Sequence, residues 1–419
     1  MDQINTWRKS FFAIYLGQSF SLLSSSVVQF SIIWWITIET GSALALTIAS
    51  VAGLLPQALI GLFAGVWIDR FNRKNIIILA DGIVAASSLL LGILFFLGIQ
   101  SLTLVYIVLF VRALGETFHK PALQALIPQI VPQAELTKAG GFGQMINTAC
   151  TMLGPMLGAL LMSITNLQWI MLLDVLGAFL AIVALTIIKT PQLNSNQTGK
   201  IYVFQDMKQG ILAIKSNKAL LRLSIPMLIS TIVFVPLGIL LPLMVRNYFF
   251  GSAWHNGLVQ TLFSLGMLVA AILISVSGGL KKQFLMISLF TGLLGLTSII
   301  AGLIPANLFW VFCILVFLMG SAGSGFNIPF TAYIQRSVPP ENLGKVLSLI
   351  TSVMSFAAPI GMFIAGPIAE TIGINNWMII AGILMIVVGI VSYISTKEFD
   401  IKLDREDMIY SPPLKKRAS

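Results

Sequence analysis

Long uninterrupted apolar runs are the feature that most constrains how this chain folds. Each run can span a hydrocarbon core of about 30 Å, which needs about 20 helical residues. Because the apolar residues are continuous and do not alternate with polar ones, the runs predict an all-α integral membrane protein and not a β-barrel. The composition agrees, since 57% of the residues are hydrophobic and 10% are charged, against about 25% charged in soluble domains. The twelve predicted spans cover roughly 10–36, 44–69, 74–97, 101–126, 137–164, 167–189, 219–248, 254–278, 281–304, 307–334, 343–371 and 375–396.

The basic residues predict the orientation of these spans. All of them except Arg112 and Arg246 fall in segments that a twelve-span topology places on one face. By the positive-inside rule that face is cytoplasmic, so we expect a multi-pass protein of the cell membrane with both termini in the cytoplasm. The net charge of +10 is therefore an orientation signal, and we expect no nucleic-acid partner. No cleavable signal is expected, because Arg8 and Lys9 lead directly into a full-length span.

One long polar segment divides the chain into two halves of similar length. We predict an N-terminal six-helix bundle over 1–189, a cytoplasmic linker over 190–218, a C-terminal six-helix bundle over 219–396 and a cytoplasmic tail over 397–419. A short amphipathic helix is expected in the linker, around 204–214. The halves match in sequence at His119-Lys120-Pro121 and Asn327-Ile328-Pro329, which predicts two pseudo-symmetric bundles.

A charged hairpin joins the second and third spans. It reads Gly65-Val66-Trp67-Ile68-Asp69-Arg70-Phe71-Asn72-Arg73-Lys74. Gly65 allows a neighbouring backbone to approach, and Asp69 is placed to attract the positive N-terminus of another helix. The pattern G-x-x-x-D-R-x-x-R-K resembles the hairpin signature of the major facilitator superfamily, although Asn72, which tolerates a left-handed turn, replaces the usual glycine. The alternative is a generic positive loop. The predicted cytoplasmic gate consists of Gly65, Asp69, Arg70, Arg73, Lys74 and Asp81, with Asp81 joining the basic cluster.

Ionisable residues inside the spans are few, because each costs at least about 2.5–3.5 kcal/mol to insert. Arg112 and Glu116 lie one turn apart in span four, so we predict an ion pair that acts as a protonation switch, with His119 as a relay. The alternative is an ion pair that only rigidifies the helix. Asp174 is predicted to be an outer gate contact or a proton site. The proton-coupling residues are thus expected in the N-terminal half: Glu116, Arg112, Asp174 and His119.

Polar stripes predict where the substrate cavity lies. Four polar residues in the first span recur every three or four positions, which places them on one helix face that must contact protein or water. We predict a cavity wall, with hydrogen bonding between helices as the alternative. In the C-terminal half, the positions that match Glu116 and His119 hold the neutral residues Ser324 and Asn327, which we expect to contribute hydrogen-bonding contacts. The predicted cavity residues are Gln18, Ser21, Ser25, Gln29, Ser324 and Asn327.

Other motifs narrow the class of protein. Gly154-Pro155-x-x-Gly158 resembles an element of facilitator antiporters and favours export, although a simple helix kink is the alternative. Cys150 and Cys313 lie in apolar runs and are predicted to be packing residues. The sequence has no nucleotide-binding loop, no His/Cys metal cluster and no G-x-S-x-G elbow. We therefore expect no cofactor, no metal and no enzymatic activity.

Three sequence runs in spans four to six resemble the macrolide efflux proteins of the major facilitator superfamily. The runs are Arg112…Gly115…Phe118-His119-x-Pro121-Ala122-Leu123, Val131-Pro132…Leu136-Thr137-Lys138 and Asp174-Val175-Leu176-Gly177-Ala178. The resemblance implies a secondary active exporter of hydrophobic drugs, macrolide-type antibiotics in particular, driven by inward proton movement through alternating access. It implies drug, protons and membrane lipid as partners of a monomer, and it leaves open a separate ATP-binding protein. The alternatives are a lipid or lysolipid flippase on the same fold and a membrane-embedded enzyme.

Overall fold

The computed structural model describes residues 2–188, 203–280 and 282–410, and every regular element within them is helical. Twelve of the described helices are long and apolar enough to cross a membrane. The predicted all-α membrane fold is therefore confirmed. The elements are α1 (Asp2–Thr40), α2 (Ala43–Arg70), α3 (Arg73–Phe96), α4 (Leu102–Ile130), η1 (Gln133–Glu135), α5 (Leu136–Ile164), α6 (Leu167–Ile187), α7 (Val203–Ser216), α8 (Lys218–Leu243), the π-helical turn η2 (Met244–Tyr248), α9 (Ala253–Ser277), α10 (Gln283–Leu303), α11 (Phe309–Ser337), α12 (Pro340–Ile372) and α13 (Ile374–Tyr410).

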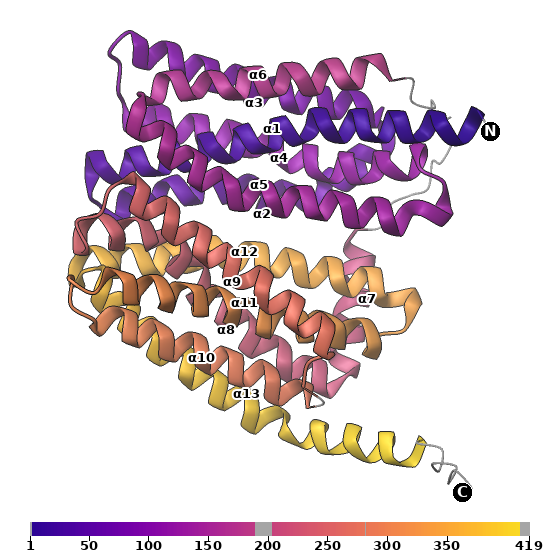
Figure 1. The fold of residues 1–419 in the computed structure, drawn as a ribbon. Helices are drawn as coiled ribbons and strands as arrows, with labels where there is room; N and C mark the ends of the chain where they lie inside the picture. The colour runs from indigo at the N-terminus through magenta and orange to yellow at the C-terminus, as the bar shows by residue number, and fades with distance from the viewer. Residues whose placement is uncertain (1, 189–202, 281, 411–419) are drawn as a thin grey trace, which may run out of the picture.

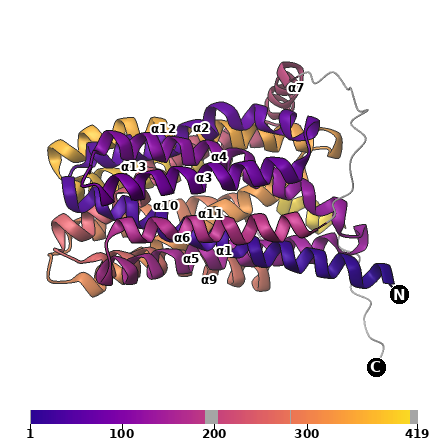
Figure 2. The ribbon, with the colours of Figure 1, turned by 90° about the horizontal axis from the view of Figure 1, so that it is seen from above.

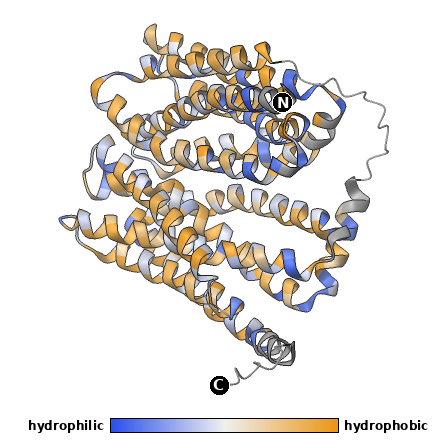
Figure 3. Cartoon of the chain, turned by 45° about the vertical axis from the view of Figure 1, so that its right-hand side comes forward, coloured by the Kyte–Doolittle hydropathy of each residue, from blue (hydrophilic) through white to orange (hydrophobic). Residues whose placement is uncertain are grey.

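The long helices form two bundles that lie side by side, α1–α6 and α8–α13 (Figure 1). We call the face at which α1 begins and α13 ends the terminal face, and the other the opposite face. The short helix α7, expected from the linker sequence, lies near the terminal face, where it packs against α12 (Figure 2). Hydrophobic residues run along the long helices, whereas hydrophilic ones gather toward their ends (Figure 3). Each long helix thus has the apolar length that a membrane requires.

The two bundles are joined near the opposite face. There α2 packs against α12, and α5 packs against α9. Glu370 of α12 accepts hydrogen bonds from the backbone N–H groups of Ala43 (2.6 Å) and Leu44 (3.2 Å), at the start of α2. It also accepts one from the Ser42 hydroxyl (3.0 Å). Because the first N–H groups of a helix have no intrahelical partner, this carboxylate caps a helix of the other bundle.

The buried cores differ between the two faces. The largest apolar cluster includes residues of both bundles near the opposite face, such as Trp34 and Leu241. Nearer the terminal face the N-terminal bundle has separate clusters, one around Ile14 and Ile77 and another around Phe11. The described packing therefore joins the bundles near the opposite face and keeps these N-terminal clusters separate near the terminal face.

The α2–α3 hairpin turns through Phe71 and Asn72. Asn72 does not adopt the left-handed conformation that it would tolerate, because its φ is −63°. Its side chain instead accepts a hydrogen bond from the Lys74 backbone N–H at 3.0 Å and caps α3. Asparagine is among the best N-cap residues, so it serves this hairpin without a positive φ.

Glycines bring helices of the C-terminal bundle into backbone contact. A Cβ atom placed on Gly295 of α10 would lie 2.5 Å from the carbonyl oxygen of Gly382 on α13. One placed on Gly320 of α11 would lie 2.0 Å from the carbonyl oxygen of Phe263 on α9. Such spacing allows helices to pack at short range inside a membrane, where small residues favour association.

Candidate functional site

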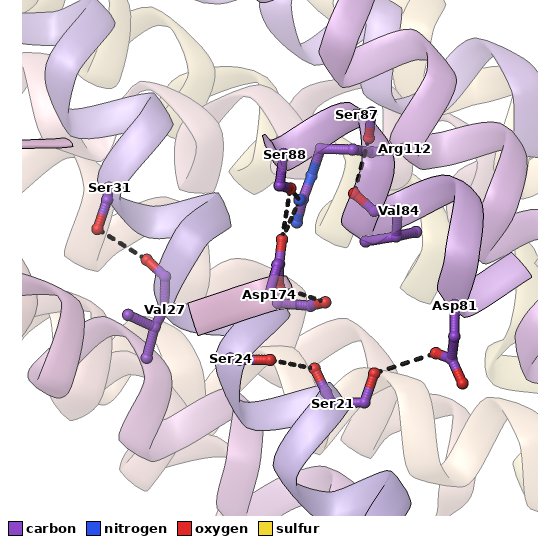
Figure 4. A network of polar contacts seen from close by, with 11 residues as sticks. Ser21, Ser24, Val27, Ser31, Asp81, Val84, Ser87, Ser88, Arg112 and Asp174 are labelled. Carbon is purple, nitrogen blue, oxygen red and sulfur yellow. Dashed lines mark hydrogen bonds and ion pairs between the residues drawn. The ribbon is translucent and has the colours of Figure 1, made fainter. Parts of the chain in front are cut away.

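A buried ion pair between Arg112 of α4 and Asp174 of α6 lies inside the N-terminal bundle (Figure 4). The two residues are 1% and 2% exposed. Arg112 Nη1 also donates to the Ser88 hydroxyl. Ser88 Oγ donates to Asp174 Oδ2 at 2.8 Å, and Ser25 Oγ donates to Asp174 Oδ1 at 3.0 Å. The Asp174 carboxylate is thus neutralised by a permanent cation and held by donors from α1, α3 and α4.

The predicted ion pair between Arg112 and Glu116 is wrong. Arg112 reaches Asp174, whereas Glu116 is exposed on α4. Spacing of four residues brings side chains near each other on an isolated helix. In the bundle, however, α4 packs against α3, which supplies the Ser88 hydroxyl, and the Arg112 side chain reaches the buried Asp174 carboxylate of α6. Inside a membrane protein a charged side chain pairs with an opposite charge that is also buried, and for Arg112 that partner is Asp174.

A second buried cluster surrounds Asp81 of α3, which is 4% exposed. Asp81 accepts hydrogen bonds from Gln18 Nε2 (3.2 Å) and Ser21 Oγ (3.0 Å) of α1. His119 Nε2 of α4 lies 3.3 Å from Asp81 Oδ1 and 2.8 Å from Gln18 Oε1. Since an amide oxygen only accepts, His119 donates through Nε2–H. The prediction that Asp81 joins the basic hairpin is therefore wrong, because α1 and α4 supply its partners.

The polar stripe of α1 lies against both acids. Ser21 binds Asp81, and Ser25, one turn along, binds Asp174. Gln18 is fully buried, and Gln29, further along the stripe, is exposed. Gln18, Ser21 and Ser25 therefore make hydrogen bonds between helices, which was the alternative to a cavity wall. They supply the donors that the two buried carboxylates require.

The hairpin cations bind the ends of neighbouring helices. Arg73 Nη1 donates to the carbonyl oxygen of Ala125 at 3.2 Å, and Lys74 Nζ donates to that of Ile188 at 2.8 Å. Cations near helix C-termini satisfy carbonyl groups and interact favourably with the helix dipole. Arg70 is exposed. Gly65 lies within α2, but its surroundings and the side chain of Asp69 lie outside what the structure describes.

The predicted C-terminal cavity residues differ in exposure. Ser324 is buried and donates to the backbone oxygen of Met267 at 2.9 Å, so it joins α11 to α9. Asn327 is exposed. Ser324 therefore makes a hydrogen bond between helices, which provides the acceptor that a buried hydroxyl needs.

The glycine-proline element of α5 contacts two neighbours. Cβ atoms on Gly154 and Gly158 would lie 2.0 Å from Ser26 Oγ and 2.7 Å from the Phe30 ring on α1. On the other side, a Cβ atom on Gly257 of α9 would lie 2.9 Å from the carbonyl oxygen of Pro155. The element therefore lets α5 pack closely against α1 in its own bundle and against α9 in the other.

Sequence reasoning missed Ser88 and the link between Gln18 and His119. A signal for Ser88 was available, because it follows Asp81 by seven residues and so lies on the same face of α3. The partners of His119 depend on how α1 and α4 are rotated, which helical spacing within one span does not define. Cys150 and Cys313 are buried free thiols, as packing residues would be.

Twelve spanning helices in two joined bundles, with an ion pair buried between helices of the N-terminal bundle, define an integral membrane carrier. A family model described as transmembrane secretion effector matches residues 5–417. Macrolide efflux protein A of Streptococcus pyogenes is 36% identical over 392 residues, covering 93% of this chain and 97% of that protein. Its namesake in Enterococcus faecalis is 35% identical over 323 residues, covering 77% and 100%. The chain belongs to the major facilitator superfamily, in the branch of the macrolide efflux proteins, and is a transporter rather than an enzyme.

Solved structures with the same fold are more distant in sequence. A bacterial homologue of the human lysosomal transporter Spinster, in an inward-facing and unoccupied conformation, is 15% identical, with a TM-score of 0.68. The match covers 95% of this chain and 98% of that one. At this identity the likeness shows the fold alone.

Proposed function

We propose that this protein exports hydrophobic drugs, macrolide-type antibiotics among them, in exchange for inward-moving protons. Relatives named macrolide efflux protein A and multidrug efflux pump Tap, the latter from Mycolicibacterium fortuitum and 24% identical, support drug export. The observation that carries the proton-driven part is the buried network inside α1, α3, α4 and α6. Acids and a histidine inside a membrane-spanning bundle are characteristic of proton pathways.

Alternating access is the mechanism that the two-bundle architecture supports best. The bundles, over 1–189 and 219–396, would rock against each other about a central substrate site. If the terminal face is cytoplasmic, as the basic residues predict, the described arrangement corresponds to an inward-open state, closed outside by the Glu370 cap. The transporter acts as a monomer in this proposal, because each chain contains both bundles.

Energetics restrict what one proton can drive. A charge that crosses 100 mV is worth about 2.3 kcal/mol, and about 1.4 kcal/mol supports a tenfold gradient. One proton exchanged for one neutral drug therefore sustains a gradient of roughly 40-fold. If the drug is a monovalent cation, one-for-one exchange moves no net charge, and only the pH difference drives it.

Drug accumulation in cells tests the proposal. Cells that express the protein should hold less of a radiolabelled macrolide than cells that carry the empty vector. A protonophore should abolish the difference while cellular ATP is maintained. Equal accumulation in the two strains contradicts drug export, and a difference that survives the protonophore contradicts proton drive.

In this proposal the α2–α3 hairpin closes the terminal face in the outward-open state. Asp69 lies at the end of α2, where its carboxylate would interact with the positive N-terminus of α12, as Glu370 interacts with α2. Asp69→Asn should reduce drug efflux several-fold while the protein inserts normally into the membrane, as judged by its abundance there. Asp69→Glu is the matched control and should retain most efflux. Parent-level efflux by Asp69→Asn would refute the latch.

A further inference from the structure

The two buried acids of the N-terminal bundle differ in how their charge is balanced. Asp174 contacts Arg112, which keeps its proton under all relevant conditions, so that pair is neutral with no proton added. Asp81 contacts two neutral donors, Gln18 and Ser21, and one group that gains and loses a proton, His119. With a neutral imidazole and an ionised carboxylate, the Asp81–His119 pair has a net charge of −1. The pair is therefore neutral only after it binds one more proton.

From this difference we infer that Asp81 and His119 together form the site that binds the transported proton. The inference rests on the proposed proton-driven export and specifies the proton-binding groups within it. Binding adds one proton from water to the pair, on the carboxylate or on the free ring nitrogen, and release returns it. No other bond forms or breaks. Because Asp81 is 4% exposed, release leaves an uncompensated charge in a buried site, which is unfavourable unless water enters or a cation approaches.

The described charged side chains on the surrounding helices are engaged elsewhere or exposed. On α6, Asp174 is paired with Arg112 of α4. Glu116 and Lys120, the other charged residues of α4, are exposed. The α2 residues in the adjoining core, Ala64 and Ile68, are apolar.

On α3 itself, the charged neighbours lie two turns or more toward the terminal face. Lys74 binds the backbone oxygens of Thr186 and Ile188, and Arg73 binds that of Ala125. On α5, the exposed Lys138 pairs with Glu135. Among the described side chains, His119 is the titratable partner within contact distance of Asp81.

The pair also has a physical route to the interface between the bundles. Gln18 and Ser21, which bind Asp81, belong to α1. The same helix packs closely against α5 at Gly154, and α5 contacts α9 of the other bundle at Gly257. A change of charge at Asp81 alters the hydrogen bonds that hold α1, and α1 lies against the helix that meets the second bundle. Proton binding can thereby bias the position of the two bundles.

Drug movement in proteoliposomes separates proton binding from a structural role. Two assays are compared: uptake of a radiolabelled macrolide driven by an imposed pH gradient, and exchange of labelled for unlabelled macrolide at equal pH. Exchange needs drug binding and rocking but no net proton transfer. The variants are Asp81→Asn and His119→Gln, and the matched control is Glu116→Gln, which removes an exposed acid one turn from His119.

We expect Asp81→Asn to lose gradient-driven uptake at least tenfold while it retains exchange, His119→Gln to lose gradient-driven uptake in part, and Glu116→Gln to retain both. Parent-level gradient-driven uptake by Asp81→Asn overturns the inference. Loss of exchange in both Asp81→Asn and His119→Gln also overturns it, because the pair would then be structural. If the parent exchanges macrolide but shows no gradient-driven uptake, the proposed proton drive itself fails, which is a distinct result.

Discussion

The two bundles share a fold but fill their interiors in different ways. At the offset of 208 that relates the halves, Arg112 of α4 corresponds to Gly320 of α11. Arg112 reaches across its bundle to Asp174, whereas Gly320 leaves space for the backbone of α9. At this position the N-terminal bundle thus has a buried ion pair between helices, and the C-terminal bundle has a glycine in contact with a neighbouring backbone.

The difference is the basis for placing the proposed proton response in the N-terminal half. Contacts between glycine and backbone, such as that of Gly320, have no protonation state, and a buried carboxylate of the C-terminal bundle, Asp400, caps the start of α10. Hydrogen bonds to a buried carboxylate change when its charge changes. Under the proposed function, the N-terminal half therefore carries the groups whose charge changes.

Removal of one member of the ion pair should have the largest effect on stability. Asp174→Ala leaves the Arg112 charge buried and unpaired, which costs about 3–5 kcal/mol. Thermal unfolding in detergent measures the loss. The matched control is the double variant Arg112→Met with Asp174→Leu, which removes both charges and should recover most of the stability. A single variant as stable as the parent would show that this pair does not hold the N-terminal bundle together.

The C-terminal bundle should be sensitive to added volume instead. Gly320→Ala places a methyl group 2.0 Å from the Phe263 carbonyl oxygen, so α9 and α11 must separate, at a cost of about 1–3 kcal/mol. Gly292→Ala in α10 is the control, because nothing lies within 4 Å of its Cβ position. The control should be neutral or stabilising by up to about 1 kcal/mol. Equal unfolding temperatures for the two variants would contradict backbone packing at Gly320.

The smallest expected effect concerns the contact between the bundles, in which Glu370 of α12 caps the start of α2. Glu370→Gln keeps an acceptor for the start of α2 but removes the charge that favours the helix N-terminus, so the opposite face should open about two- to fivefold more often. The rate at which a thiol reagent modifies Thr47→Cys reports this opening, because Thr47 is buried beside Gly366 of α12. Glu370→Asp is the control. An unchanged rate in Glu370→Gln would mean that the carboxylate does not hold this face closed.

Local patterns predicted the elements, and packing determined the partners. The apolar runs predicted the twelve spans and the polar linker predicted α7, because both depend on residues close together in the chain. Helical spacing placed Glu116 near Arg112, but the orientation of α4 within the bundle directs the Arg112 side chain to Asp174 of α6. In the same way, helical spacing predicted the polar stripe of α1 but did not predict that it contacts Asp81 and Asp174. Those contacts join residues 60 or more positions apart, as Ser21 and Asp81 are.

Distances between the bundles test the central claim, that the two halves rock as alternating bodies under the control of protons and drug. One pair of spin labels, at Phe71 and Ser348, reports the terminal face, and another, at Ile99 and Leu308, reports the opposite face; all four positions are exposed. A change of pH or the addition of macrolide should shorten the terminal-face distance and lengthen the opposite-face distance in matched samples. Distances that stay fixed, or that lengthen at both faces together, would contradict the account.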